Sequence, residues 1–351
     1  MTPTPAVPNQ TGPPYETYVG AIILALTTLR IAYLATNPFD LSADEAYYWH
    51  WSQHLDICYY SKPPMIAWIN ALSTALFCIN EFAVRLPAIL MASGSITALY
   101  FATKTIYGTR AGFWCVACLI SAPGNLPMAL LMTIDSPLTF GWSLALMGYA
   151  QAFFSKEHKP RKRGWTLAAI GTAFALLSKQ MGAFLIILPI LYRLATRKPQ
   201  KGLFPGILEV IAGSLIAAVP IIAWNAMNGW IMFRHTGHHF ESGDAVILDR
   251  IVDFIVLIGT NAFLIGPLFL YLILITLRKF LPTRSQLPAS AWFLVIFSLI
   301  PLAVFVLLAL RQRVNPNWPL VYLLPLFIAI PGILCSNTKV SKIPHKHLLT
   351  S

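Results

Sequence analysis

The sequence predicts an all-α, polytopic membrane protein with about ten transmembrane helices. Of its 351 residues, 57% are hydrophobic and only 11% are charged, which is too apolar for a water-soluble domain of this size. Apolar segments recur along the chain, and short basic clusters separate them. The formal net charge of +12 is therefore spread between spans, a pattern that favours anionic lipid headgroups over nucleic acid as the partner.

Ten apolar segments are the predicted spans, because each is long enough or apolar enough to cross a bilayer. They are residues 19–36, 86–103, 113–131, 137–154, 165–178, 181–192, 207–224, 251–277, 289–310 and 318–335. An eleventh stretch, 65–80, is either a juxtamembrane helix or a further crossing. The two short segments on either side of Lys179 are predicted to form a hairpin, since this arrangement leaves most Lys and Arg residues on one side of the membrane.

The whole chain, 1–351, is predicted to be one transmembrane domain with both termini in the cytoplasm. Residues 1–18 contain five prolines and no Lys or Arg, so we expect a disordered segment rather than a cleavable signal peptide. The first external loop is predicted at 37–85, and a basic cytoplasmic tail at 336–351. With this topology, the unusual polar residues all lie on the external side.

Residues 41–64, LSADEAYYWHWSQHLDICYYSKPP, are polar between apolar neighbours. Their tyrosines and tryptophans favour a membrane interface. The carboxylates of Asp44 and Glu45 are adjacent, and Lys62 precedes two prolines that hold it in an extended conformation. Asp44 is a candidate general base, although a helix N-cap after Ser42 is an alternative. Lys62 is a candidate phosphate ligand, or else an interfacial lysine whose ammonium reaches water.

Two motifs in this stretch, DEAYYW at 44–49 and YYSKPP at 59–64, resemble the first external loop of GT-C integral-membrane glycosyltransferases. The most similar group contains the lipid A aminoarabinose transferase and the protein O-mannosyltransferases. The resemblance implies a GT-C fold with juxtamembrane helices in this loop and a polyprenyl-phosphate-linked sugar as donor. It also implies a catalytic carboxylate at Asp44 and a phosphate-binding lysine at Lys62.

Further segments are similar to motifs of the same family. They are EFAVRLPA at 81–88, TIDSPL at 133–138, LLSKQMG at 176–182, WNAMNGWIMFRHTGHHF at 224–240 and NWP at 317–319. In the third of these, Gln180 replaces the small residue of the family pattern. The resemblance is strongest from 40 to 90 and weaker beyond 180.

Sugar transfer from a polyprenyl phosphate needs a base for the acceptor hydroxyl and positive charge for the leaving phosphate. We expect Asp44 to be the base and Glu45 to support it. The predicted phosphate-binding residues are Lys62, Arg85, Lys179, Arg311, Arg313 and Tyr60. The predicted substrate-binding residues are Tyr47, His50, Asp135, His238, Asn317 and Trp318.

Several of these residues have structural alternatives. Arg85 could pair with Glu81 one helical turn away, and Asp135 could neutralise Lys179. The segment from Arg311 to Trp318 could anchor the membrane edge.

No cofactor is predicted, although a divalent cation stays open because His235, His238 and His239 lie near Glu241 and Asp244. A sugar- or headgroup-binding surface is the favoured interpretation of that loop. The expected partners are a polyprenyl-phosphate-sugar donor, a lipid, glycan or protein acceptor, and membrane lipids, with no nucleic acid. The expected location is a bacterial inner membrane, with the active site facing the periplasm.

Two other functions compete with a glycosyltransferase. A transporter or flippase of lipid-linked sugars also needs intramembrane charge, but it favours matching halves and a site at the midplane. Here the charges gather on one face. A non-catalytic relative that binds lipid-linked sugar is the third interpretation, and the intact Asp44 argues against it.

Overall fold

The computed structural model describes residues 14–36, 39–197, 202–238, 247–280, 288–310 and 312–335, and their regular elements are all helices. In chain order these are α1 (Tyr15–Ala35), α2 (Ala43–Ser52), α3 (Met65–Phe77), α4 (Glu81–Tyr107), α5 (Thr109–Ser121), α6 (Asn125–Leu130), α7 (Asp135–Phe154), α8 (His158–Ser178), the 3₁₀ turn η1 (Gln180–Ala183), α9 (Phe184–Thr196), α10 (Leu203–Met227), α11 (Ile231–His238), α12 (Ile247–Ile265), α13 (Pro267–Phe280), α14 (Ala289–Ala309), the 3₁₀ turn η3 (Leu320–Leu323) and α15 (Leu324–Cys335). The predicted all-α class is confirmed.

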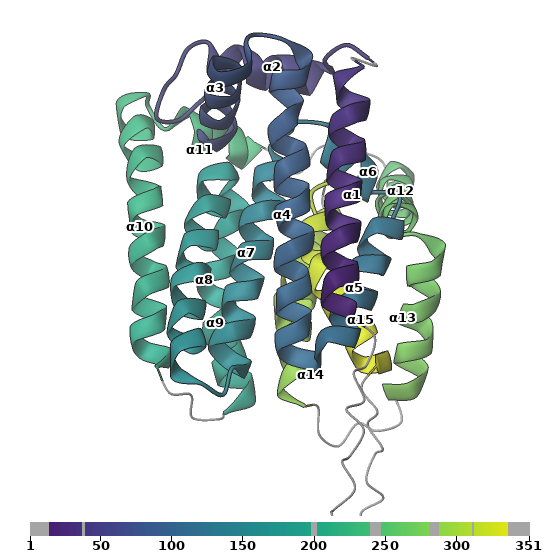
Figure 1. Ribbon diagram of the computed structural model, residues 1–351. Coiled ribbons are helices and arrows are strands. Elements are labelled where there is room, and N and C mark those ends of the chain that lie inside the picture. Colours follow the sequence, from purple (N-terminus) through teal and green to yellow (C-terminus); the bar gives the residue numbers. More distant parts are fainter. Residues whose placement is uncertain are drawn as a thin grey trace, which may run out of the picture.

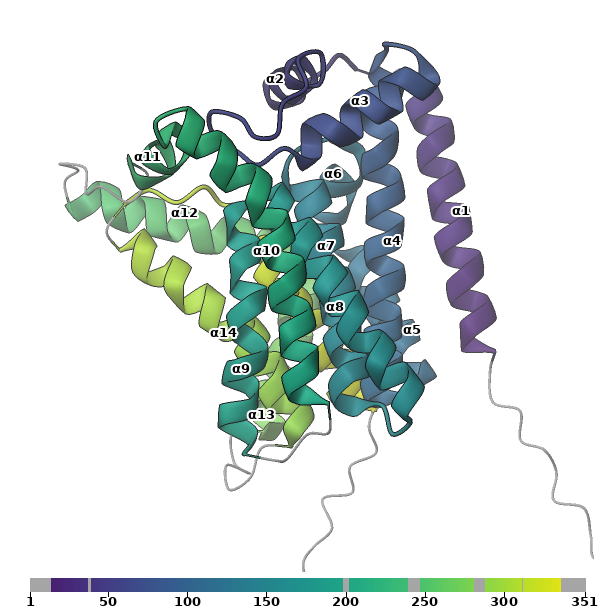
Figure 2. The same ribbon diagram turned by 90° about the vertical axis from the view of Figure 1, so that its left-hand side faces the viewer.

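The long helices stand side by side as a bundle, and α2, α3 and α11 gather at one end, which we call the upper end (Figure 1). Among the described helices, α1, α4, α10 and α14 are each long and apolar enough to cross a membrane alone. The helix α3 has only 13 residues and lies across the upper end rather than along the bundle (Figure 2). The stretch at 65–80 is therefore a juxtamembrane helix and not a crossing.

Two predicted spans are interrupted in the structure. The segment predicted at 113–131 stops at Ala122, whose extended backbone precedes Pro123, and resumes as the short α6. The span predicted at 251–277 is not one straight helix, because α12 and α13 meet at Gly266 with a bend of 97°. Gly266 has a φ of +88°, and Pro267 begins the next helix, where its missing N–H costs nothing.

The predicted hairpin at Lys179 is present. α8 ends at Ser178, and Lys179 takes up an extended conformation with φ −158° and ψ 141°. The following 3₁₀ turn folds back onto α8, since a Cβ at Gly182 would lie 2.4 Å from the backbone nitrogen of Leu176. The chain therefore reverses at the upper end, which leaves Lys179 at the tip of the turn.

The closest helix pair is α7 with α8, which pack backbone against backbone along a glycine seam formed by Gly141, Gly148, Gly164 and Gly171. A Cβ at Gly148 would lie 2.3 Å from the backbone nitrogen of Ala168, and one at Gly171 would lie 2.4 Å from that of Ala145. Small residues spaced along both helices allow this approach, as in other membrane helix pairs. The upper ends of α7 and α8 are thereby held at a fixed separation.

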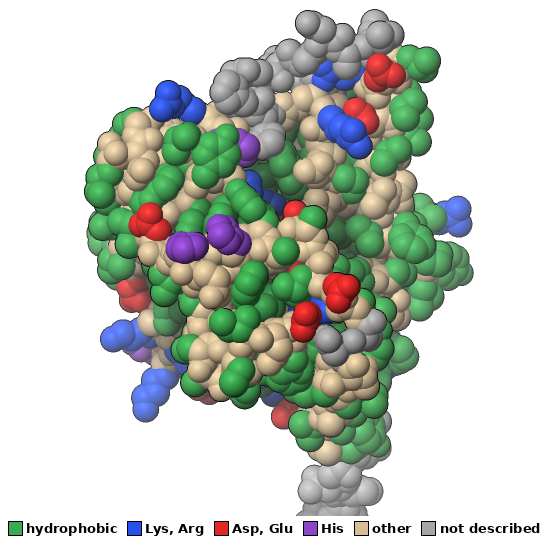
Figure 3. All heavy atoms as spheres, turned by 90° about the horizontal axis from the view of Figure 1, so that it is seen from above, with side chains coloured by type: hydrophobic (Ala, Val, Ile, Leu, Met, Phe, Trp, Pro, Cys, Tyr) green, Lys and Arg blue, Asp and Glu red, His purple; other side chains and the backbone are tan. Residues whose placement is uncertain are grey.

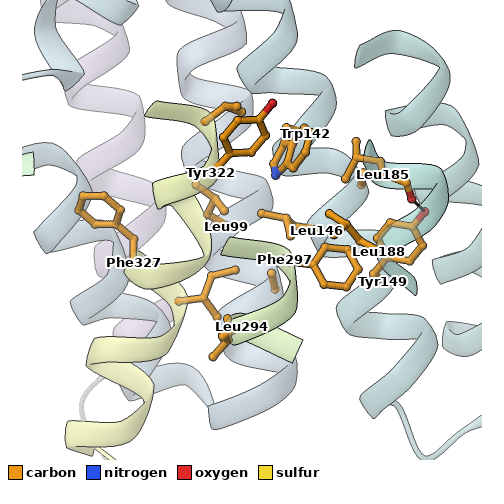
Figure 4. Packing of buried hydrophobic residues seen from close by; sticks show 14 of the residues in the cluster. Leu99, Trp142, Leu146, Tyr149, Leu185, Leu188, Leu294, Phe297, Tyr322 and Phe327 are labelled. Carbon is orange, nitrogen blue, oxygen red and sulfur yellow. Dashed lines mark hydrogen bonds between the residues drawn. The ribbon is translucent and has the colours of Figure 1, made fainter. Parts of the chain in front are cut away.

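The core of the bundle is aromatic and aliphatic (Figure 4). Trp142 and Tyr149 of α7 are fully buried and contact Tyr322 and Phe297, with ring centroids 5.0 and 5.2 Å apart respectively. The Tyr149 hydroxyl donates a hydrogen bond of 2.7 Å to the Leu185 carbonyl. These contacts pack α9, α14 and η3 against α7.

Candidate active site

The first helix of the external loop, α2, begins with a complete capping box. Ser42 is the N-cap, and its hydroxyl accepts from the Glu45 amide at 3.4 Å, while the Glu45 carboxylate accepts from the Ser42 amide at 3.0 Å. Asp44 lies in the first turn with an exposed side chain. Ser42 is therefore the N-cap of α2, and Asp44 does not have the capping role that was its alternative. The Asp44 carboxylate makes no hydrogen bond or ion pair with any residue that the structure describes.

Glu45 points the other way and forms a buried ion pair with Arg85, and both side chains are fully buried. The Arg85 Nε and Nη2 atoms donate to the two carboxylate oxygens at 2.8 and 2.9 Å, and the amide of Met132 donates to the same carboxylate at 3.0 Å. Burial by itself would raise the pKa of Glu45, but the hydrogen bonds from Arg85, Ser42 and Met132 lower the pKa below its usual value.

Arg85 is thus part of the support of the loop. Its remaining contacts, 2.7 Å each, go to the carbonyls of Phe39 and Asp40. Its ion-pair partner is Glu45 rather than Glu81, because the loop folds down over the start of α4. Both Glu45 and Arg85 hold the position of α2, and neither faces the exposed side on which Asp44 lies.

Lys62 lies in a tight turn that ends the loop, where the Tyr59 amide donates to the Lys62 carbonyl at 3.2 Å. Tyr59 is stacked on Trp51 with ring centroids 4.5 Å apart. The Lys62 ammonium makes no hydrogen bond or ion pair within the described part of the chain. Burial is the main cause that lowers the pKa of Lys62 to about 8, and Lys179 lowers it further, whereas Asp135 and Asp44 act in the opposite direction.

The upper ends of α7 and α8 bring Asp135 and Lys179 together. The Lys179 ammonium lies 2.9 Å from the Asp135 carboxylate, and both side chains are buried. The side-chain amide of Asn317 donates to the other oxygen of Asp135 at 2.5 Å. Lys179 also lies over the Trp318 ring, 5.7 Å from its centroid. The segments TIDSPL, LLSKQMG and NWP, which are far apart in the sequence, therefore meet at one point.

The loop and the helix ends share one electrostatic site. The charges of Asp44, Asp135 and Lys179 all act on Lys62. Those of Asp44 and Asp135 also add to burial in raising the pKa of Tyr48, which lies one turn after Asp44. Seen from above, the upper face is hollowed near its centre, with basic and acidic side chains inside the hollow (Figure 3). A carboxylate and an ammonium, neither of them paired among the described residues, therefore lie at the same end of the bundle.

The other predicted site residues lie around this centre or away from it. Tyr47 and His50 are exposed on α2, and Tyr60 contacts His235 of α11 with ring centroids 4.7 Å apart. Arg313 is 81% exposed and lies 3.7 Å from Asp253 of α12, so its position is at the margin.

Arg311 lies outside the described residues, as do His239, Glu241 and Asp244, and the side chain of His238 is not described. Within the described ranges, no three His, Cys, Asp or Glu side chains are grouped as metal ligands. The structure therefore does not test the divalent cation that the histidine loop left open.

The attachment of the loop to α10 and α11 was not predicted. The Trp224 indole donates to the Asp56 carboxylate at 2.6 Å, and the buried Cys58 sulfur lies 3.5 Å from that of Met232. The buried Asn225 side chain accepts from the Met232 amide at 3.2 Å. The segment WNAMNGW does carry a sequence signal for this attachment, because its polar residues interrupt an apolar helix. Only the tertiary contacts show that these residues bind the loop and α11.

Residues 61–224 match the family model described as dolichyl-phosphate-mannose-protein mannosyltransferase. The chain is 27% identical over 276 residues to the lipid A galacturonosyltransferase RgtD of Rhizobium johnstonii, a match that covers 76% of this chain and 55% of that protein. The chain thus spans about half the length of this curated relative.

Two solved structures share the fold. ArnT from Cupriavidus metallidurans bound to undecaprenyl phosphate superposes with a TM-score of 0.68 and 18% identity, over 91% of this chain and 59% of that one. The oligosaccharyltransferase of Archaeoglobus fulgidus, tethered to an acceptor peptide, gives a TM-score of 0.56 and 14% identity, over 90% of this chain and 49% of that one. The chain therefore shares its fold with these two membrane transferases, and its sequence is similar to the mannosyltransferase family model over residues 61–224.

Proposed function

We propose that the chain transfers a sugar from a polyprenyl-phosphate donor to an acceptor at the upper end of the bundle. The observation that carries this proposal is that an ammonium and a carboxylate, both unpaired among the described residues, lie within electrostatic reach of each other at the upper end of the bundle. Lys62 presents a partly buried ammonium without a described partner, and Asp44 presents an exposed carboxylate in its electrostatic reach. The ammonium suits the donor phosphate, and the carboxylate suits the acceptor.

In the proposed reaction Asp44 accepts the proton of the acceptor hydroxyl as its oxygen attacks the anomeric carbon of the sugar. The bond from that carbon to the phosphate oxygen breaks, and its electron pair leaves with the phosphate. A phosphate needs no proton to leave, so one carboxylate is sufficient. Lys62 stabilises the charge that develops on the departing oxygen.

The other described cations of the predicted phosphate site are ion-paired. Arg85, Lys179 and Arg313 each have a carboxylate partner, namely Glu45, Asp135 and Asp253. The Lys179 and Asp135 pair lies beside Lys62 and keeps the Lys179 ammonium in place. We assign Lys179 to orientation of the phosphate. Asn317 and Trp318 support the ion pair of Lys179 with Asp135. Arg85 and Glu45 hold α2 in its position.

The relatives suggest which substrates to test first. One solved relative contains undecaprenyl phosphate, and the curated relative is named as a lipid A galacturonosyltransferase. We therefore propose an undecaprenyl-phosphate-linked sugar as donor, with galacturonic acid as the first candidate, and a lipid A-type acceptor. The corresponding location is a bacterial inner membrane with the upper end facing the periplasm.

The direct test uses purified protein with undecaprenyl phosphate–galacturonic acid and lipid A. Transfer should release undecaprenyl phosphate and increase the acceptor mass by one sugar residue, both measured by mass spectrometry. Donor consumption by wild type and loss of it in Asp44→Asn would support the proposal. Movement of the intact donor across a vesicle membrane without any transfer would instead favour the transporter alternative and overturn it.

Sidedness is tested separately by cysteine labelling in intact cells, in a background without the native cysteines. Asn315→Cys lies near the upper end, and Lys159→Cys lies at the first turn of α8, at the opposite end. A membrane-impermeant reagent should reach the first and not the second. Labelling of Lys159→Cys alone would place the hollow on the cytoplasmic side.

A further inference from the structure

At the end of the bundle opposite the candidate active site, the first turns of α8 and α10 leave a cavity of about 330 Å³. Its lining includes His158, Arg161, Lys162 and Trp165 of α8 and Glu209 of α10. These two helices pack directly against each other (Figure 2). The cavity is separate from every residue assigned above to sugar transfer.

The lining residues of α8 follow one another at i, i+3, i+4 and i+7, so they lie on a single helix face. A helix face that packs against another helix in a membrane is ordinarily small or apolar. Higher up the same pair this holds, because Gly213 approaches the carbonyl of Ala169. In its first two turns the face of α8 is basic instead, with Arg161 and Lys162 directed toward the cavity.

The cations of this face are only partly neutralised. Arg161 is held by hydrogen bonds from its Nη2 atom to the carbonyls of Ser155 at 2.9 Å and Lys156 at 3.3 Å, which keep its full positive charge. The Lys162 ammonium makes no hydrogen bond or ion pair with a described residue. Glu209 is the single carboxylate in the lining, and it accepts a hydrogen bond of 3.0 Å from the Thr166 hydroxyl.

The floor of the cavity is Trp165, which is 3% exposed. Gly206 lies against its ring so closely that a Cβ there would be 2.0 Å from the ring atoms. The indole Nε1 of Trp165 is buried and has no hydrogen-bond partner among the described residues, and an unsatisfied donor of this kind ordinarily costs free energy. Trp165, two cations and one carboxylate therefore line the same cavity.

We propose that this cavity binds the headgroup of a membrane phospholipid with an amino group, the phosphate lying against Arg161 and Lys162 and the ammonium against Glu209. A phosphate diester carries one negative charge and accepts hydrogen bonds from both cations. The carboxylate disfavours a purely anionic headgroup and favours one that ends in an ammonium. Basic cavities between helices at a membrane surface are suited to lipid headgroups, which are concentrated at that depth.

The experiment measures retention of short-chain lipids by the detergent-purified full chain in native mass spectrometry, together with the melting temperature. Phosphatidylethanolamine is compared with phosphatidylglycerol, phosphatidylcholine, soluble phosphoethanolamine and inorganic phosphate. We expect phosphatidylethanolamine to be retained best and to raise the melting temperature. Lys162→Ala should weaken its retention by about tenfold or more, since a charge-assisted hydrogen bond is lost.

The matched control is Arg163→Ala, which removes the same charge from the same helix at an exposed residue outside the cavity lining. Glu209→Gln should abolish the preference for phosphatidylethanolamine over phosphatidylglycerol while leaving phosphate binding intact. Equal retention by Lys162→Ala and Arg163→Ala would overturn the site. Stabilisation by inorganic phosphate as strong as that by the lipid would assign the cavity to a soluble phosphate compound, and the lipid proposal would fail.

Discussion

Replacing Lys62 by arginine should remove most of the pH dependence with which the protein binds undecaprenyl phosphate. In the free protein burial lowers the pKa of Lys62 to about 8. The lowered pKa means that the ammonium loses its proton as the pH rises through 8, and with the proton it loses its attraction for phosphate. Binding should therefore be strongest below pH 8 and weaken above it. Arginine stays charged throughout this range.

The magnitude follows from proton linkage. If the bound phosphate restores the pKa of Lys62 to its usual 10.5, the shift of about 2.5 units corresponds to about 3 kcal/mol of coupling between proton and ligand. Between pH 7.5 and pH 9.5 the dissociation constant should then rise by roughly 20-fold. A phosphate monoester has a second pKa of about 6, so its own charge is constant over this interval.

The assay is a titration of detergent-purified protein with undecaprenyl phosphate at a series of pH values, with undecaprenol, which lacks the phosphate, as the control lipid. Wild type should show the decline for the phosphate and not for the alcohol. Lys62→Ala should bind weakly at every pH, and Lys62→Arg should bind with little change across the series. An equal decline in wild type and Lys62→Arg would refute the assignment of Lys62 as the phosphate ligand.

Other substitutions separate chemistry from support. Asp44→Asn should lower transfer by about 10²- to 10⁴-fold with unchanged undecaprenyl phosphate binding and melting temperature; activity within a few-fold of wild type would remove it as the base. Arg85→Met leaves the Glu45 carboxylate buried without its partner and should lower the free energy of unfolding by about 3 to 5 kcal/mol, which would appear as a large drop in melting temperature. A melting temperature like that of wild type would contradict the buried pair. Gly171→Ala should lower the melting temperature because its Cβ meets the α7 backbone, whereas Gly20→Ala, which has nothing within 4 Å, should not; equal effects would argue against the seam.

Local patterns predicted the position of the site but not the partners within it. The resemblance of the loop motifs implied juxtamembrane helices in this loop, which α2 and α3 provide, and the positive-inside tally placed Lys179 at a turn on the same side. Glu45 was not predicted as the partner of Arg85, because the two partners considered were Glu81, one helical turn away, and a phosphate. Glu45 lies 40 residues earlier, and the two meet only when the loop folds over α4.

A different reason explains why the bend within 251–277 was not predicted. Averaged hydropathy continues through Gly266 and Pro267, although that dipeptide is a strong signal of a break. In the structure α12 turns away at this point, and its Asn261 side chain donates to the Pro316 carbonyl at 3.0 Å. The segment that carries Asn317 and Trp318 is therefore held by α12, the first half of the predicted span.

The glycine seam between α7 and α8 also restricts how the site can change during turnover. Helices in backbone contact cannot slide past one another without breaking that contact, so the distance between Asp135 and Lys179 is set by the seam rather than by the ligand. Entry of the proposed lipid-linked sugar must then be accommodated by the first loop and α11, which are joined through side chains such as Cys58 and Met232. We expect the phosphate-binding side of the hollow to stay rigid while its opposite wall adapts to the substrate.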